Sequence, residues 1–533
     1  MTSQLEKITP PKDLSDEQKA TVFQHIFRRL ADYRNTAALY SLLECSFTSG
    51  GDEVISKQHE FETEINRWAQ SLLEKAWIRI ARNLTLSDTA TCDIEKLPSK
   101  DVISKTLNTI LFLDITTSKQ YSARTRAFLS TLGPLDESVI VTTLKNPEHV
   151  IEEAQKQADA TKSDHADRGK TLRMVGMGLG AVAGGILVGV TGGLAAPLVG
   201  AGITTVLGWL GVGGSVLGLL ASGLAGSSVV CGALFGMYGA RSTAAMVERH
   251  TKEVSDLALI PVKNKEKGYD ALGVRLCISG WLANKDDVTA PWKIFDGDDT
   301  FALQWEIEAL EELSDALMTL IKSHAMKYVK GEVIKRTVFA ALMNSLAPLA
   351  LLKMGQIIDN PWMNARALAI KTGAVLGDLL ANQVFGNRPV TLTGYSLGSL
   401  VIYEALKHLA SLPPSKTAHL IQDVFLFGTP VTAEPEKWTS IRRVVSGRLV
   451  NGYSSNDYVL AVLCRLSDTT WKVAGLESVD AKGVENISCE EVEGHTRWRW
   501  MIGKCLEKSG APGVAAQQVE EQVSTQPQEL DST

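Results

Sequence analysis

Apolar residues recur at intervals of three and four positions through the first 150 residues, as in TVFQHIFRRLADY and INRWAQSLLEKAWIRIA. This period places an apolar stripe along one face of each helix, and LSDEQ supplies a polar helix-start signal. The pattern predicts a helical N-terminal region over residues 1–160, followed by a charged linker over residues 161–173. His25 and His59 in this region are interpreted as surface or helix-packing residues.

The next pattern is an uninterrupted apolar run, because no charged residue or histidine occurs between Arg173 and Arg241. One helical crossing of a bilayer needs only ~20 residues, and glycines at four-residue spacing allow helices to pack closely in lipid. Pro197 divides the run. We predict a glycine-rich transmembrane hairpin over residues 174–240, with two crossings as the simplest count and three if the second stretch folds back. The alternative is a buried glycine-rich core of a soluble protein.

Positive charge is balanced on the two sides of this run. The flanking segments carry four and three basic residues: Lys162, Arg168, Lys170 and Arg173 before it, and Arg241, Arg249 and Lys252 after it. The balance favours an even number of crossings. The first residues lack the apolar core of a secretory signal. We therefore expect an integral protein of an intracellular membrane, with the N-terminus and the C-terminal domain facing the cytosol.

From about residue 262 to 508, short β-branched runs alternate with amphipathic helical segments. This alternation predicts an α/β fold with a mostly parallel sheet covered by helices. The predicted strands are GVRLCISGWL, DTFALQWE, RPVTLTGYS, QDVFLFGTPV, SGRLVNGYS and VENISCEEVEG, and the predicted helices span about 306–330, 332–356, 361–384 and 398–411. Residues 509–533 are small and polar, which predicts a disordered tail.

Composition and charge exclude several classes of function. The net charge of −6 and the pI of about 5.9 argue against a nucleic-acid partner. The seven cysteines are scattered without a close-spaced pair, as expected for reduced thiols rather than for a zinc site. No dinucleotide fingerprint, phosphate loop or HExxH helix occurs, so neither a cofactor nor a metal is predicted.

The strongest chemical signal is the sequence Gly394-Tyr395-Ser396-Leu397-Gly398, which lies between the strand RPVTLT and a predicted helix. This is the G-x-S-x-G nucleophile elbow in its strand-turn-helix context. The turn is strained, and glycines are needed at 394 and 398 because a side chain there would collide with neighbouring elements. The pattern predicts Ser396 as a nucleophile.

A serine hydroxyl needs a histidine base, and the base needs an acid that orients it. In folds that carry the G-x-S-x-G elbow, the acid and then the histidine follow the serine along the chain. His495, just past a late strand, is the predicted base, because His408 lies on the predicted helix after the elbow and His419 precedes the next strand. Asp457, at the carboxyl end of RLVNGYS, is the predicted acid and Asp480 is the rival. Asp423 is excluded because it begins its strand.

The predicted oxyanion hole combines two backbone N–H groups. One is that of Leu397, at the N-terminus of the helix after the elbow. The other comes from the loop after LCISG, where Trp281 and Leu282 are both candidates and Gly280 allows close approach of the backbone.

Together these segments resemble the transmembrane-and-coiled-coil domain-containing protein 4 family over roughly residues 15–508. The matching segments are RMVGMGLGAVAGG, LCISGWL, FALQWE, TGYSLGS, VFLFGTPV, NGYSSNDYVL and EGHTRW. The resemblance implies a helical N-terminal region, a membrane segment and an α/β-hydrolase domain, with Ser396, Asp457 and His495 as the triad.

The sequence thus predicts a membrane-anchored serine hydrolase, of the lipase or esterase kind, that cleaves acyl esters at or near a membrane. Its expected partners are the lipid bilayer and a lipid or acyl-ester substrate. The alternative is an integral-membrane scaffold or trafficking protein whose hydrolase-like domain has little turnover, because fold alone does not give function.

Overall fold

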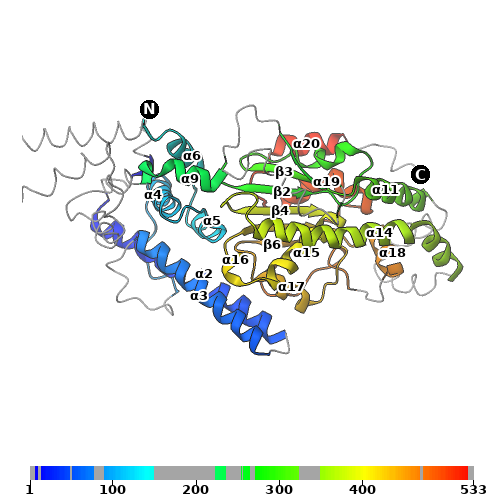
Figure 1. The fold of residues 1–533 in the computed structure, drawn as a ribbon, viewed down its shortest axis with the longest axis horizontal. Helices are drawn as coiled ribbons and strands as arrows, with labels where there is room; N and C mark the ends of the chain where they lie inside the picture. Colours follow the sequence, from blue (N-terminus) through cyan, green and yellow to red (C-terminus); the bar gives the residue numbers. More distant parts are fainter. Residues whose placement is uncertain are drawn as a thin grey trace, which may run out of the picture. The chain divides into compact units, whose positions relative to one another are not determined.

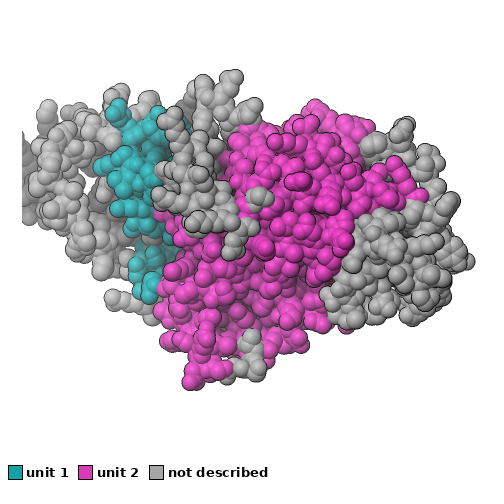
Figure 2. All heavy atoms as spheres, turned by 45° about the vertical axis from the view of Figure 1, so that its right-hand side comes forward, with its two compact units in different colours: residues 1–36, 65–236 teal, residues 37–64, 237–533 magenta. Residues whose placement is uncertain are grey.

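The computed structural model describes residues 7–9, 14–47, 51–76, 89–148, 223–235, 254, 256–263, 271–322, 348–467 and 472–525. The chain forms two compact units, coloured teal and magenta in Figure 2. The first comprises residues 1–36 and 65–236, and the second comprises residues 37–64 and 237–533. The segment 37–64, which the sequence groups with the N-terminal region, therefore belongs to the second unit.

The first unit is helical, as predicted. It contains parts of α2 (Asp16–Phe47) and α3 (Asp52–Ala76), together with α4 (Lys100–Ser118), α5 (Ala123–Ser130), α6 (Glu137–Lys145) and α9 (Ser227–Phe235). Trp68 meets the ring of Phe128 edge-on at 6.2 Å, and its indole N–H donates to Thr125 Oγ1 at 3.0 Å. Thr125 donates in turn to Asp114 Oδ2 at 3.0 Å. The helices are thus joined by an apolar core in which the buried polar groups of Trp68, Thr125 and Asp114 are hydrogen-bonded to one another.

Helix α9 belongs to the predicted membrane segment. It has nine residues, which is far short of the ~20 that one crossing needs. Val230 and Leu234 are buried, and Cys231 Sγ donates to the carbonyl of Leu144 in α6 at 3.6 Å. In the part of the chain that the structure describes, no helix combines the length and apolarity of a membrane span. Residues 174–222 and 236–240 of the predicted hairpin lie outside the described residues.

The second unit contains a mixed sheet, and its seven described strands lie in the order β1-β3-β2-β4-β5-β6-β7. Figure 1 labels β3, β2, β4 and β6, which follow one another in this order. The strands are β1 (Ala258–Pro261), β2 (Val274–Ile278), β3 (Asp299–Gln304), β4 (Val390–Tyr395), β5 (Ile421–Phe427), β6 (Leu449–Tyr453) and β7 (Val484–Ser488). All neighbours pair in parallel except β1, which is antiparallel to β3. The six predicted strands and the mostly parallel sheet are confirmed. Strand β1 was not predicted, because its four residues are too few to establish an alternation.

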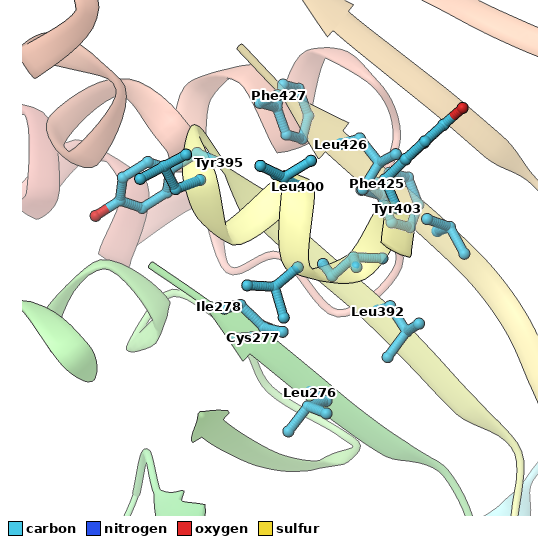
Figure 3. Close-up of a cluster of buried hydrophobic side chains, with 14 of the residues drawn as sticks. Leu276, Cys277, Ile278, Leu392, Tyr395, Leu400, Tyr403, Phe425, Leu426 and Phe427 are labelled. Carbon is cyan, nitrogen blue, oxygen red and sulfur yellow. The ribbon is translucent and has the colours of Figure 1, made fainter. Parts of the chain in front are cut away.

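Strands β2, β4 and β5 are buried along their whole length. A parallel strand covered on both faces is apolar at successive positions rather than at alternate ones. Figure 3 shows the resulting core, in which side chains of these strands gather around the helix that follows β4: Leu276, Ile278, Leu392, Phe425 and Phe427, with Leu400 and Tyr403 from the helix. This core fixes the carboxyl ends of the strands relative to one another.

Long helices accompany the sheet: α11 (Ile307–Lys322), α14 (Pro348–Ala381) and α15 (Leu397–Ser411). A Cβ added at Gly373 of α14 would lie 2.7 Å from the carbonyl oxygen of Val401 in α15, so the two helices approach closely there. The sequence predicts a helix break before Pro361, yet α14 continues through it. Tertiary packing here outweighs the loss of one helical hydrogen bond at proline.

Shorter helices complete the second unit. They are the 3-10 helices η6 (Lys285–Val288), η7 (Ala290–Trp292) and η8 (His495–Arg497), with α16 (Pro414–Thr417), α17 (Pro435–Arg442), α18 (Tyr458–Ser467), α19 (Trp498–Lys508) and α20 (Ala516–Ser524). The prediction of disorder from residue 509 is wrong for α20. This polar helix is held by burial of Val519 and by Gln522, whose side chain accepts from the Gly503 N–H at 2.9 Å and donates to the Pro291 carbonyl at 2.8 Å.

Residues 37–64 make several polar contacts within the second unit. Glu44 accepts from Arg443 Nε at 2.5 Å, and the arginine side chain is only 2% exposed. Glu60 accepts from the hydroxyl of Ser415 at 2.7 Å. The guanidinium carbon of Arg442 lies 4.2 Å from the ring centre of Tyr40. These contacts explain why the segment belongs to the compact unit of the sheet.

Candidate active site

The turn between β4 and α15 holds Ser396 in a strained conformation. Its φ and ψ are 56° and −131°, a region that non-glycine residues rarely occupy and that is often found at functional sites. The Ser396 N–H donates to the Phe427 carbonyl at 2.9 Å, at the end of β5. The serine therefore stands at the carboxyl edge of the sheet and at the N-terminus of a helix, as the sequence predicts.

Gly394 and Gly398 lie in the positions that the elbow requires. A Cβ on Gly398 would lie 2.1 Å from the carbonyl oxygen of Ile278, and one on Gly394 would lie 2.8 Å from Ile402 Cδ1. The first collision is with backbone, which cannot move aside without separating β2 from the elbow. The absence of side chains is thus what lets the turn fit against β2.

The structure brings Ser396, His495 and Asp457 together. Ser396 Oγ lies 2.5 Å from His495 Nε2, and His495 Nδ1 lies 2.7 Å from Asp457 Oδ2. All three are buried, with exposed fractions of 1% for the serine and 0% for the other two. This is the relative placement of nucleophile, base and orienting acid in a serine triad.

The rival residues lie elsewhere. Asp480 is exposed. His408 is on α15, where Nε2 lies 2.8 Å from Asp378 Oδ1 of α14. Asp423, excluded by its place at the start of β5, accepts from the N–H of Arg448 at 2.7 Å.

The Asp457 carboxylate has two further donors that the sequence did not reveal. The indole N–H of Trp498 donates to Oδ2 at 2.8 Å, and the N–H of Leu460 donates to Oδ1 at 3.0 Å. Trp498 is fully buried, and a Cβ on Gly428 would lie 2.5 Å from its Nε1. The acid is therefore held in one orientation by three donors. The only sequence signal for Trp498 was its position three residues after His495.

The loop after β2 lies against the elbow. A Cβ on Gly280 would be 2.1 Å from the carbonyl oxygen of Tyr395 and 2.4 Å from the nitrogen of Leu397. Among the described residues, none accepts a hydrogen bond from the backbone N–H of Leu397, Trp281 or Leu282. The Leu397 nitrogen thus lies against the loop residue that precedes Trp281, and the predicted oxyanion donors have no acceptor among the described residues.

A buried polar network supports this loop. Ser279 Oγ donates to the carbonyl of Asp287 at 2.8 Å, and the Asp287 carboxylate accepts from the N–H groups of Ala283 and Asn284 at 2.7 and 3.2 Å. The other carboxylate oxygen is bonded by Arg499 of α19. Burial raises the pKa of Asp287, and the Arg499 guanidinium opposes that shift. The sequence does not predict either residue, because the two are 212 positions apart.

No cluster of three or more His, Cys, Asp or Glu side chains suited to a metal ion occurs in the described parts of the two units.

Residues 169–511, more than half of the chain, match the family described as "Protein of unknown function (DUF726)". The chain belongs to this family. No solved structure matches it. The resemblance to the transmembrane-and-coiled-coil domain-containing protein 4 family remains a prediction.

Three relatives show what the chain is similar to. An uncharacterized membrane protein of Schizosaccharomyces pombe is 37% identical over 64% of this chain and 59% of its own length. The rice transmembrane and coiled-coil domain-containing protein STS1 is 34% identical over 67% of this chain and 55% of its own. The probable lipase MIL1 of Saccharomyces cerevisiae is 33% identical over 62% of this chain and 30% of its own. The matched region thus spans little more than half of the first two relatives and less than a third of the last.

Proposed function

We propose that this protein is a serine hydrolase of the α/β-hydrolase fold that cleaves acyl esters at a membrane. The observation that carries the proposal is the continuous contact from Ser396 Oγ through His495 to Asp457, over distances of 2.5 and 2.7 Å. A structural serine has no need of a histidine that is itself oriented by a buried carboxylate.

In the proposed reaction, Ser396 Oγ attacks the acyl carbonyl as His495 Nε2 takes its proton. Collapse of the tetrahedral intermediate breaks the ester bond, and His495 returns the proton to the leaving alcohol. Water then attacks the acyl-serine with His495 as base, releasing the acid. Asp457 keeps the proton of the neutral imidazole on Nδ1 and stabilises the imidazolium.

The oxyanion would be bound by the N–H of Leu397 together with that of Trp281 or Leu282. The close approach of Gly280 to the Leu397 nitrogen and the lack of acceptors for these N–H groups among the described residues support this role. Pre-oriented donors in a site that excludes water stabilise the developing charge, and loss of one typically costs ~10²- to 10³-fold in kcat.

The substrate class is inferred from the proposed membrane attachment and from the names of similar proteins. A relative covering 62% of this chain is named a probable lipase, and others are named membrane proteins. The uncharged run over residues 174–240 would hold the catalytic domain at a bilayer, with this domain and the N-terminus on the cytosolic side of an intracellular membrane. An acyl ester of a membrane lipid fits this placement.

The test is hydrolysis of a panel of p-nitrophenyl and glycerolipid esters by the purified full-length protein. We expect turnover of at least one ester by the wild type and by Ser411→Ala, an exposed serine at the end of α15. Ser396→Ala should lose at least 10³-fold, since only binding and oxyanion stabilisation remain. Equal rates for Ser396→Ala and wild type would reject the proposal, and a folded but inactive wild type would favour the scaffold.

A further inference from the structure

A cavity of about 600 Å³ lies in the second unit, and none of the three triad residues lines it. Its walls come from the chain just after β1, from η7 and from α19 and α20. The volume is within the range of ~300–1,000 Å³ that is common for small-molecule sites.

The walls combine apolar surface with positive charge. Val262, Pro291, Ile294 and Trp500 supply the apolar part. The charged side chains are three cations and one carboxylate: Lys263, Lys293, Arg499 and Glu521. An apolar wall with a few convergent cations is suited to a ligand that has an apolar chain and an anionic end.

Arg499 is the central cation. It is 9% exposed, and its guanidinium lies 4.1 Å from the ring centre of Trp500, which also lines the cavity. A guanidinium has five N–H donors, yet within the described residues Asp287 alone accepts from it. Other N–H groups of the buried Arg499 guanidinium are therefore available to a ligand.

The lysines can contribute without breaking a strong pair. Lys263 is bonded to Asp296 at 2.5 Å, but that carboxylate is 61% exposed, and exposed pairs of this kind stabilise by only ~0–1 kcal/mol. Lys293 is exposed and forms no ion pair with a described residue. Both ammonium groups can turn toward an anion at Arg499.

The wall made by α20 is already in place. Gln522, a lining residue, bridges the Gly503 N–H of α19 and the Pro291 carbonyl of η7. A site formed before its ligand arrives has little ordering cost at binding.

We propose that this cavity binds an amphiphile with an anionic head group, either a carboxylate or a phosphate monoester. The head group accepts hydrogen bonds from Arg499 and pairs with Lys263 and Lys293, and the apolar chain lies against Val262, Ile294 and Trp500. Through Arg499 the ligand touches the same network that supports the loop after β2.

The experiment is calorimetric titration of the full-length protein in nanodiscs of uncharged lipid, with empty nanodiscs as the blank. Octanoate, octyl phosphate and 1-octanol are titrated below their micellar concentrations. We expect one site for at least one anion, with at least tenfold weaker binding of octanol. Binding of octanoate alone assigns the carboxylate, binding of octyl phosphate alone assigns the phosphate, and binding of both assigns the shared anionic head group.

The double variant Lys263→Gln with Lys293→Gln should weaken binding of the anion at least tenfold. Lys504→Gln, an exposed lysine of α19 that does not line the cavity, should remain within twofold of wild type. Because calorimetry requires no turnover, Ser396→Ala should bind as wild type does whether or not the protein is an esterase. Loss of binding in Ser396→Ala, an unaffected double variant, equal binding of octanol or no binding of either anion would each overturn the proposal.

Discussion

At the scale of single residues, the candidate site depends on one carboxylate that accepts three hydrogen bonds. His495, Trp498 and the backbone of Leu460 all donate to Asp457. A buried network in which every polar group is satisfied is rigid, and loss of one member affects the others. Two predictions follow from the separate roles of these donors and of the acid.

Asp457→Asn should preserve folding and reduce ester turnover. The amide no longer selects the productive imidazole tautomer, and the same replacement in a serine-protease triad lowers kcat about 10⁴-fold. The measurement is kcat for the best ester of the panel. Asp480→Asn is the control and should stay within twofold of wild type; a larger loss in Asp480→Asn than in Asp457→Asn would assign the acid to Asp480.

Trp498→Phe should lower kcat by roughly tenfold while leaving KM nearly unchanged. It removes a hydrogen bond to an ionised group, worth ~1.5–3 kcal/mol in typical cases, without adding volume near Gly428. Lys504→Gln, an exposed change on the same helix, should leave kcat unchanged. An unaltered kcat in Trp498→Phe would mean that the indole serves packing alone.

The sequence could predict Ser396, His495 and Asp457 as neighbours because each follows a strand whose carboxyl end lies at one edge of the sheet. It could not predict Asp287 and Arg499. Neither has a local pattern, and their pairing exists only after η6 and α19 have packed together.

At the scale of elements, the contact between the loop after β2 and the elbow determines whether the site can form. Gly280→Ala should therefore be strongly destabilising and should abolish ester turnover. Its Cβ would lie 2.1 Å from the carbonyl oxygen of Tyr395, and overpacking against less rigid neighbours already costs ~1–3 kcal/mol.

The measurement is the melting temperature together with ester turnover. Gly51→Ala is the matched control, because nothing lies within 4 Å of an added Cβ there. It should melt within a degree or two of wild type and remain active. A Gly280→Ala protein as stable and active as the control would contradict the close approach of the loop.

The hydrophobic pattern was enough to predict the buried parallel strands, because continuous apolar runs such as that of β5 have few other interpretations. The pattern could not predict elements that depend on tertiary contacts. Strand β1 is short and has no buried residue in its pattern. Helix α14 continues through Pro361 because α15 packs along it. Helix α20 depends on one buried valine and on the hydrogen bonds of one glutamine.

For the molecule as a whole, we propose that the uncharged run over residues 174–240 attaches the protein to a membrane. Removal of residues 174–222 retains α9 and should release the protein from membranes after alkaline carbonate washing. The second unit has its own core, so the released protein should still hydrolyse soluble esters. A variant lacking only residues 526–533 should remain in the pellet. Persistent sedimentation of the 174–222 deletion would place the anchor elsewhere.

The division into units was beyond the reach of local patterns. Residues 37–64 have the same helical period as their neighbours, yet they belong with the sheet through side-chain contacts such as that of Glu44 with Arg443. Such pairings join positions far apart in the chain, and a periodic pattern carries no information about them.

Covalent labelling with a fluorophosphonate, followed by peptide mass spectrometry, measures whether Ser396 is an activated nucleophile. Activation requires both the base and the oxyanion donors. We predict a single adduct on Ser396 in the wild type and in Ser411→Ala, no adduct in Ser396→Ala and at least 100-fold slower labelling in His495→Ala. An adduct on another residue, or equal labelling of wild type and His495→Ala, would contradict the account.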